Sequence, residues 1–223
     1  MSNSFQARFS TTSLLLPEIL RRLEPVLDGQ GLQFFGSVAP LVAHRGWPTI
    51  AGLDFVTVPT LAALEEHARG WWGVGIELVS RPLVEAIRTS DAEVYLNVFP
   101  VPGDGWTLSY LESDAVEEYR SSSEEGARAL IQLQRSICAS CGFELSLYDE
   151  QDHSRAPVPT LRVVENAVRR RAQDGGLGDL CAVVAASALP FERALDWAGA
   201  RAGEVRLSTD GYVIFPFLRP GVG

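Results

Sequence analysis

The feature that most constrains the fold is a pair of alternating segments within residues 92–113, AEVYLNVFPVPGDGWTLSYLES. The first half alternates valine and leucine with Glu, Tyr and Asn, and the second half repeats the period of two. This period, with β-branched and aromatic residues, is typical of strands that bury one face. Residues 100–105, PVPGDG, interrupt a strand ladder because proline lacks the N–H donor and glycine favours turns. The segment therefore predicts a β-hairpin with a long turn.

A single hairpin is marginally stable in water, so other strands must extend it and helices must cover its apolar face. Alternation predicts further extended segments at residues 32–35, 38–43, 55–58, 71–79 and 143–148. Helical periodicity predicts helices at residues 61–69, 82–88 and 123–141, and another that Ser13 caps and that kinks or ends at Pro25. Residues 1–12 are polar and are predicted to be frayed. These elements predict an α+β fold, a mainly antiparallel sheet with helices on one face.

Charge divides the chain into two parts. Residues 1–154 carry 10 arginines against 21 acidic residues, a net charge of −11, whereas residues 155–223 carry 9 arginines against 7 acidic residues, a net charge of +2. Residues 151–160, QDHSRAPVPT, are polar with two prolines and predict a linker. We therefore predict an acidic α+β domain at residues 1–150, the linker at 151–160, and a second domain at 161–223.

Composition narrows the setting of the protein. All 19 basic residues are arginine. A lysine-free, alanine-rich composition is typical of a high-GC bacterial genome, and selection against lysine modification is the alternative. No apolar run approaches the ~20 residues of a membrane-spanning helix, and three cysteines do not make a disulfide framework. We therefore expect a cytoplasmic bacterial protein without a membrane partner.

Beyond the linker, the pattern predicts three helices, at residues 161–172, 177–187 and 191–202, and then a hairpin around Asp210-Gly211. This order resembles the winged helix-turn-helix family over about residues 161–217. The resemblance is carried by residues 180–187, by LPFE at 189–192 and by GEVR at 203–206. It implies a small winged-helix-like domain whose third helix often enters the DNA major groove. Winged helices also serve as protein-interaction modules.

The resemblance leaves two roles open for this segment. The third helix carries two acids, Glu192 and Asp196, against two bases, Arg193 and Arg201. This balance disfavours DNA binding, because neutralising phosphates supplies much of the affinity. For a DNA-binding role, the candidate residues are Arg162, Arg169, Arg170, Arg171, Arg193 and Arg206.

Candidate catalytic and metal-binding residues are few. Cys138 and Cys141 form a C-x-x-C motif that His153 and Cys181 would complete as a zinc site. Cys141 lies on the apolar stripe of its helix, however, so we predict that these cysteines belong to the core. His44 precedes a tryptophan-bearing loop and is the best candidate for a functional histidine, but no nucleophile motif accompanies it. We therefore predict no catalytic residue, metal or cofactor.

An acidic, tryptophan-containing surface is the feature that points to a function. Acidic residues gather after the hairpin, and tryptophans lie in the loop before the sheet and at the start of the return strand. We predict that a protein partner contacts Glu112, Asp114, Glu117, Glu118, Trp47 and Trp106. The leading hypothesis is a non-enzymatic interaction protein, with an immunity-like or defence-accessory role. The alternative is a DNA-binding transcriptional regulator that uses the winged helix.

Overall fold

The computed structural model describes residues 5–44, 47–51, 55–61, 63–68, 70–80, 84–85, 93–150, 158–173 and 180–217. The strands are β1 (Phe5–Phe9), β2 (Leu32–His44), β3 (Trp47–Ile50), β4 (Val56–Thr57), β5 (Gly73–Ser80), β6 (Glu93–Val101), β7 (Gly105–Glu112), β8 (Leu145–Glu150), β9 (Leu180–Ala185), β10 (Arg206–Leu207) and β11 (Tyr212–Phe217). The helices are α1 (Leu16–Gly29), α2 (Leu64–His67), α4 (Asp114–Ser122), α5 (Glu124–Cys141), α6 (Leu161–Gln173) and α7 (Phe191–Ala198), followed by the 3₁₀ helix η1 (Gly199–Glu204).

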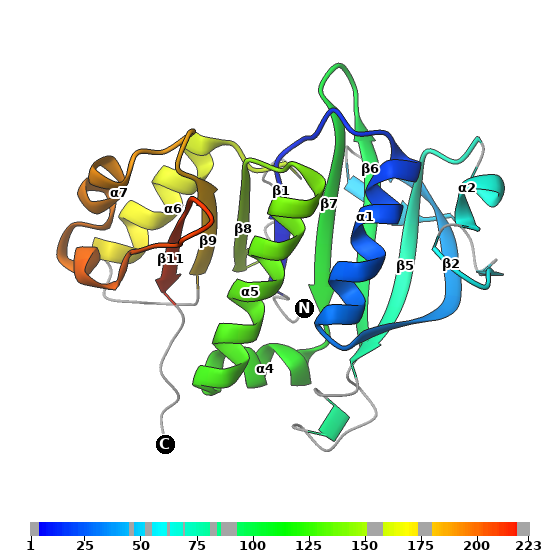
Figure 1. The fold of residues 1–223 in the computed structure, drawn as a ribbon, viewed down its shortest axis with the longest axis horizontal. Helices are drawn as coiled ribbons and strands as arrows, with labels where there is room; N and C mark the ends of the chain where they lie inside the picture. The colour runs from blue at the N-terminus through cyan, green and yellow to red at the C-terminus, as the bar shows by residue number, and fades with distance from the viewer. Residues whose placement is uncertain are drawn as a thin grey trace.

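All these strands belong to one 11-stranded sheet. Its order is β10-β11-β9-β8-β1-β7-β6-β5-β2-β3, and β4 pairs with β2 beside this path. Every pairing between named strands is antiparallel. The predicted α+β fold with a mainly antiparallel sheet is confirmed (Figure 1).

The predicted central hairpin is confirmed as β6 and β7, which pair from Val94–Glu112 to Val101–Gly105. Its turn is shorter than predicted, because β6 continues through Pro100, which lies opposite Trp106. The last pair between β5 and β6 is Val74–Val98, so β6 has a neighbour on one side only at Pro100. A strand tolerates proline at such an edge position, since no second ladder needs its missing N–H.

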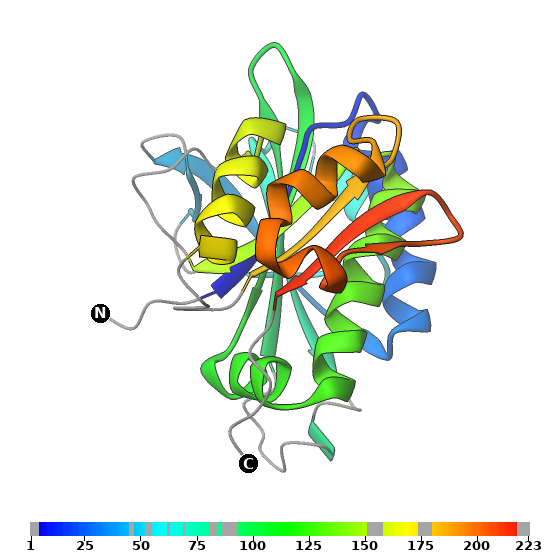
Figure 2. The same cartoon turned by 90° about the vertical axis from the view of Figure 1, so that its left-hand side faces the viewer.

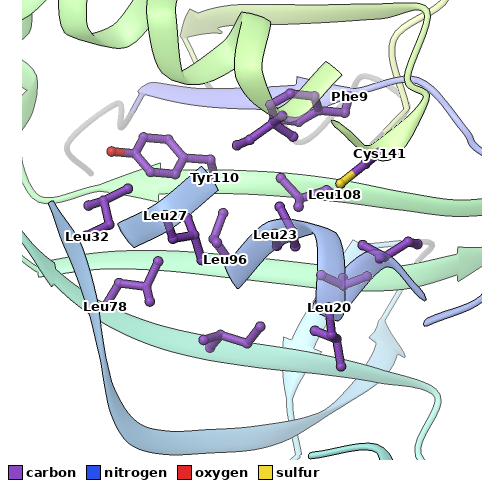
Figure 3. Packing of buried hydrophobic residues seen from close by; sticks show 14 of the residues in the cluster. Phe9, Leu20, Leu23, Leu27, Leu32, Leu78, Leu96, Leu108, Tyr110 and Cys141 are labelled. Carbon is purple, nitrogen blue, oxygen red and sulfur yellow. The ribbon is translucent and has the colours of Figure 1, made fainter. Parts of the chain in front are cut away.

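One face of the sheet is covered by α1 and α5, as the amphipathic patterns predicted. Ser123 caps α5, because its Oγ accepts from the Gly126 N–H at 2.9 Å, and Gly142 ends the helix with a φ of 69°. The helix α1 does not end at Pro25 but continues to Gly29. Figure 3 shows how the α1 side chains pack onto the sheet, with Leu20, Leu23 and Leu27 beside Leu78, Leu96 and Leu108.

The opposite face is covered by α6 and α7 over β8, β9 and β11. In this second core, Leu147 of β8, Val184 of β9 and Phe215 of β11 pack with Val168 and Trp197 of the two helices. Figure 2 shows α6 and α7 on one side of these strands and α5 on the other. The prediction that helices cover one face therefore holds for residues 1–150, and the C-terminal helices cover the other face.

The predicted helix at residues 177–187 was wrong, because residues 180–185 form the strand β9. This strand lies between β8 and β11, with helices on both faces, so both sets of alternating side chains are apolar. Such a run cannot be told from a buried helix by its periodicity. The winged-helix resemblance relied on this helix. Residues 151–157 of the predicted linker lie outside the described residues, but β8 before it and β9 after it pair directly.

The prediction that residues 1–12 are frayed was also wrong for residues 5–9, because they form β1, an inner strand between β7 and β8. Residues 1–4 lie outside the described residues. Its polar side chains are buried, and Arg8 donates from Nη2 to Asp149 Oδ1 of β8 at 2.6 Å. The polar appearance of this segment therefore hides a buried strand.

Smaller differences concern the short elements. The predicted helix at residues 61–69 is reduced to α2, after which Gly70 has a φ of 88°. The extended segments at residues 32–35 and 38–43 join in β2, with an irregularity between Phe34 and Val38. The helix α4 was not predicted. Most of the helix predicted at residues 82–88 lies outside the described residues.

We predict that replacing Arg8 alone destabilises the protein far more than replacing both members of its ion pair. Arg8→Met leaves the Asp149 carboxylate buried without its cation, which costs about 3–5 kcal/mol, whereas Arg8→Met with Asp149→Leu recovers most of that loss. Urea denaturation followed by circular dichroism measures both variants. A double variant no more stable than Arg8→Met would contradict this account of the pair.

Candidate functional site

The sheet has an open area on the face that carries α6 and α7. Those helices cover β8, β9 and β11, and in the part of the chain that the structure describes no helix packs on this face of β2, β5 and β6 (Figures 1 and 2). In Figure 2, the far end of β2 and the strand β3 lie on the same side of the sheet as α6, with α1 on the opposite side. We call this area the open face.

Strand alternation decides which side chains reach the open face. On β5 and β6, Ile76 and Leu96 are buried against α1, so their neighbours Glu77, Tyr95 and Asn97 point the other way. The register places Glu77 opposite Tyr95, and it places Gly75 opposite Asn97. A group of polar side chains from two inner strands is thus brought together on the open face.

A groove of about 280 Å³ lies over these residues, and we call it the open-face groove. Two of the residues that line it are unusual, because Phe55 is 48% exposed and Ile50 is 40% exposed although both are large and apolar. The groove is lined by Ala39, Leu41, Pro48, Ile50, Phe55, Gly75, Glu77, Tyr95, Asn97 and Leu111. It combines apolar walls with a polar floor, the usual composition of a binding site.

The floor of the groove depends on Gly75. A Cβ atom at this position would lie 3.3 Å from Asn97 Oδ1 and 3.3 Å from a methyl carbon of Leu41, tighter than an ordinary contact. The Asn97 amide is oriented by its Nδ2, which donates to Ser109 Oγ at 3.4 Å. The oxygen of Asn97 therefore lies over Gly75, as an acceptor at the floor of the groove.

Glu77 gives the groove its charge. Its side chain is half-buried, and among the described residues no arginine or histidine pairs with its carboxylate. The described lining contains no histidine, cysteine or serine. The groove therefore offers apolar contact and hydrogen-bond acceptors, the chemistry of a binding surface.

A second hollow of the same volume lies between α1 and the start of β2. Its lining includes Glu24 and Asp28, but none of the large exposed apolar side chains of the described residues belongs to it. The open-face groove is the better candidate, because exposed apolar surface marks places where another molecule binds.

Glu112, one of the predicted partner-binding residues, is buried and cannot contact a partner. Its Oε1 accepts from the Tyr110 hydroxyl at 2.6 Å and from Arg120 Nε at 3.0 Å. Arg120 also donates from Nη1 to the Gly126 carbonyl at 3.2 Å, which ties β7 and α4 to the start of α5. Burial lowers the pKa of the Arg120 guanidinium, but Glu112 and the Tyr110 hydroxyl together outweigh burial and raise this pKa above its ordinary value. This cluster is a structural element of the fold.

The other predicted partner-binding residues do not form one surface. Asp114 and Glu118 are exposed on α4, and Glu117 is partly exposed. Trp106 lies at the opposite end of β7 from α4, and the rise per residue of a strand makes that distance ~20 Å. Trp47 begins β3, four strands from β7, ~19 Å at the spacing of a sheet. The acidic and the tryptophan positions therefore belong to different parts of the molecule.

The arginines proposed for DNA binding are spread over three elements. On α6, Arg162, Arg169 and Arg170 are exposed, Arg171 is partly exposed, and Arg169 pairs with Glu165 at 3.0 Å. On α7, the Arg193 guanidinium carbon lies 5.6 Å from the Trp197 ring centre. On β10, Arg206 donates to the Gly203 carbonyl at 2.9 Å. Several of these side chains are thus engaged within the chain.

The predicted core position of the cysteines is confirmed, because Cys138, Cys141 and Cys181 are all buried. Burial raises the pKa of the Cys141 and Cys181 thiols to about 12 and that of Cys138 above its ordinary range. Within the described residues, no group of three potential ligands is placed to hold a metal ion. No described helix has the length and apolarity to cross a membrane.

Of the histidines, His44 is exposed at the end of β2 and does not line the groove. His67 is exposed on α2, with Nδ1 at 3.3 Å from the Ala63 carbonyl. His153 lies outside the described residues. The described histidines therefore form no candidate catalytic group with the groove.

The residues of the groove were missed by the sequence analysis. The period of two placed Tyr95 and Asn97 on one strand face. Ile50 and Phe55, however, reach the groove only through the pairing of β2 with β3 and β4. No spacing in the sequence records that pairing.

We predict that Glu112→Gln lowers the free energy of unfolding by roughly 3 kcal/mol, because it leaves the Arg120 charge buried without its carboxylate. The matched variant Glu144→Gln, an exposed carboxylate between α5 and β8, should change it by less than about 0.5 kcal/mol. Urea denaturation at neutral pH measures both. Equal stabilities of the two variants would show that Glu112 is not a buried structural residue.

We also predict that stability falls as pH rises above about 8.5, the ordinary thiol pKa in an unfolded chain. The folded state keeps the thiols neutral up to a higher pKa, so ionisation first favours the unfolded state. Each buried thiol then lowers the free energy of unfolding by up to about 1.4 kcal/mol for each pH unit. Urea denaturation with reductant from pH 7 to 9.5 measures the slope, and Cys181→Ala should make it shallower. Identical slopes for the two proteins would refute this assignment.

No protein-family model matches the chain, and no curated protein matches it. Two solved structures are similar to it. One, the toxic C-terminal tip of CdiA from Pseudomonas aeruginosa in complex with immune protein, is 13% identical with a TM-score of 0.36, over 70% of this chain and 90% of that chain. The other, the Pseudomonas aeruginosa T6SS protein PA0821, is 8% identical with a TM-score of 0.45, over 99% of this chain and 67% of that chain. Both TM-scores lie below 0.5, so neither likeness indicates a function for this chain.

Proposed function

We propose that this protein is a non-enzymatic binding protein that holds a protein partner against the open face of its sheet. The observation that carries the proposal is the pair of exposed apolar residues, Phe55 and Ile50, on the rim of the open-face groove. Single exposed apolar side chains are ordinary, but large apolar residues gathered at a hollow mark an interaction site. A partner that covers them gains the free energy of burying apolar surface.

The size of the groove favours a protein over a small molecule. At about 280 Å³ it is at the lower limit of pockets that enclose a small ligand, and it opens onto solvent. A segment of a protein can fill the groove and cover the exposed rings around it at the same time. The partner surface therefore extends beyond the groove itself.

Charge supports a basic partner. The chain has a net charge of −9, and residues 1–154 account for −11. Asp114 and Glu118 are exposed on α4, where they add to a field that attracts cations and repels nucleic-acid phosphates. An immunity-like or defence-accessory role, in which the protein covers the surface of a basic toxin, fits this charge.

The prediction is tested by affinity capture from a lysate of the source organism. The wild type, the groove variant Ile50→Ser/Phe55→Ser and the control Leu207→Ser each serve as bait. Leu207 is 52% exposed on β10, at the other end of the sheet, so the control removes apolar surface of the same kind. Because the groove variant loses apolar contact with the partner, its affinity should fall at least about tenfold.

Quantitative mass spectrometry identifies proteins held by the wild type and by Leu207→Ser but lost from the groove variant. The dissociation constant of the purified partner then confirms the loss. If the groove variant retains the same partners with the same affinity, the open face is not the binding surface.

A further inference from the structure

We infer that the open-face groove receives the side chain of an arginine or lysine of the partner, with Glu77 as its counter-charge. This inference rests on the proposed function and specifies the chemistry of the segment that binds. It is carried by the position of Glu77, by the acceptors beside it and by the apolar walls above it.

The floor of the groove is a set of acceptors. Glu77 lies on β5 directly opposite Tyr95, and Asn97 is its diagonal neighbour on β6. Diagonal neighbours in an antiparallel pair lie roughly 7–8 Å apart, a gap that one guanidinium or ammonium group can bridge. Because Asn97 Nδ2 donates to Ser109, its Oδ1 remains as an acceptor over Gly75. Two acceptors, one of them charged, select a donor that carries positive charge.

The walls of the groove match the rest of a basic side chain. Ile50 and Phe55 are exposed at the rim of the groove, and the buried Leu41 and the ring of Tyr95 also line it. Lysine and arginine bury their methylene stems against apolar surface while the charged end reaches polar groups. The apolar residues of the groove therefore suit the methylene stem of the side chain, and Glu77 suits its charged end.

The pairing of other carboxylates in the chain shows what Glu77 lacks. Asp149 is buried with Arg8 at 2.6 Å, and Glu112 is buried with Arg120 at 3.0 Å. Glu77 is half-buried among apolar side chains, and in the described ranges no cation of the chain pairs with it. A carboxylate partly removed from water gains most from a cation that completes its surroundings. A partner would supply that cation.

The experiment uses a displayed library of random 12-residue peptides, selected on the wild-type protein and counter-selected on Ile50→Ser/Phe55→Ser. We expect the enriched peptides to share an arginine or lysine at one position beside apolar residues. Sequencing shows which of the two basic residues the groove prefers. One enriched peptide is then synthesised, together with a copy in which citrulline or norleucine replaces its basic residue.

Fluorescence anisotropy gives the affinities of both peptides for the wild type, Glu77→Gln and Glu144→Gln. The neutral copy should bind the wild type at least tenfold more weakly, and Glu77→Gln should weaken the basic peptide by a similar factor. The two changes together should cost little more than either alone, because both remove one interaction. The matched control Glu144→Gln, an exposed carboxylate after α5, should leave both affinities unchanged.

The outcomes separate this inference from the proposed function. Enriched peptides that require Ile50 and Phe55 but share no basic residue, or that ignore Glu77→Gln, would overturn the inference and leave the binding surface in place. Failure to enrich any peptide that requires Ile50 and Phe55 would overturn both. The comparison of the basic and neutral peptides on the wild type decides the inference even if Glu77→Gln does not fold.

Discussion

The strand β1 joins the two halves of the sheet, and the rest of the structure depends on its pairing. It lies between β7 and β8, with the central hairpin, β5, β2 and β3 on one side and β9, β11 and β10 on the other. Its Ala7 and Phe9 belong to the core beneath α1 and α5, while Arg8 on the opposite face pairs with Asp149. A buried ion pair contributes little net stability, but removing one partner is costly. The pair therefore favours the register in which β1 connects both halves.

This arrangement also decides where the molecule can bind. Because α1 and α5 cover one face along much of the sheet and α6 and α7 cover the other face over β9 and β11, the described helices leave β2, β5 and β6 open on that second face. Alternation along these strands then directs Glu77, Tyr95 and Asn97 to the same side as Ile50 and Phe55. Packing of the helices and strand alternation together produce a groove with apolar walls and a charged floor.

The sequence predicted the elements whose two faces differ in polarity. In the hairpin of β6 and β7, apolar side chains under α1 alternate with mainly polar side chains on the other face, and α1 and α5 bury one face and expose the other. Their periodicity was therefore visible. The strands β1 and β9 were missed for opposite reasons: Gln6 and Arg8 are polar yet buried, and residues 180–185 are almost wholly apolar because both faces are covered. Glu112 was misinterpreted because its burial depends on Arg120 and Tyr110, a contact that a run of acidic residues does not reveal. The groove was beyond prediction, since Phe55 and Glu77 meet only through the register of β2, β4 and β5.

The most direct test of the central claim, that a protein partner binds the open face, is hydrogen–deuterium exchange of the chain with and without the captured partner. We expect binding to slow exchange in peptides covering β3, β4 and the β5–β6 pair, while exchange in α1 and α5 on the opposite face stays unchanged. Slower exchange confined to α4 or α6, with β3 and the β5–β6 pair unaffected, would contradict it and place the partner on the charged helices instead.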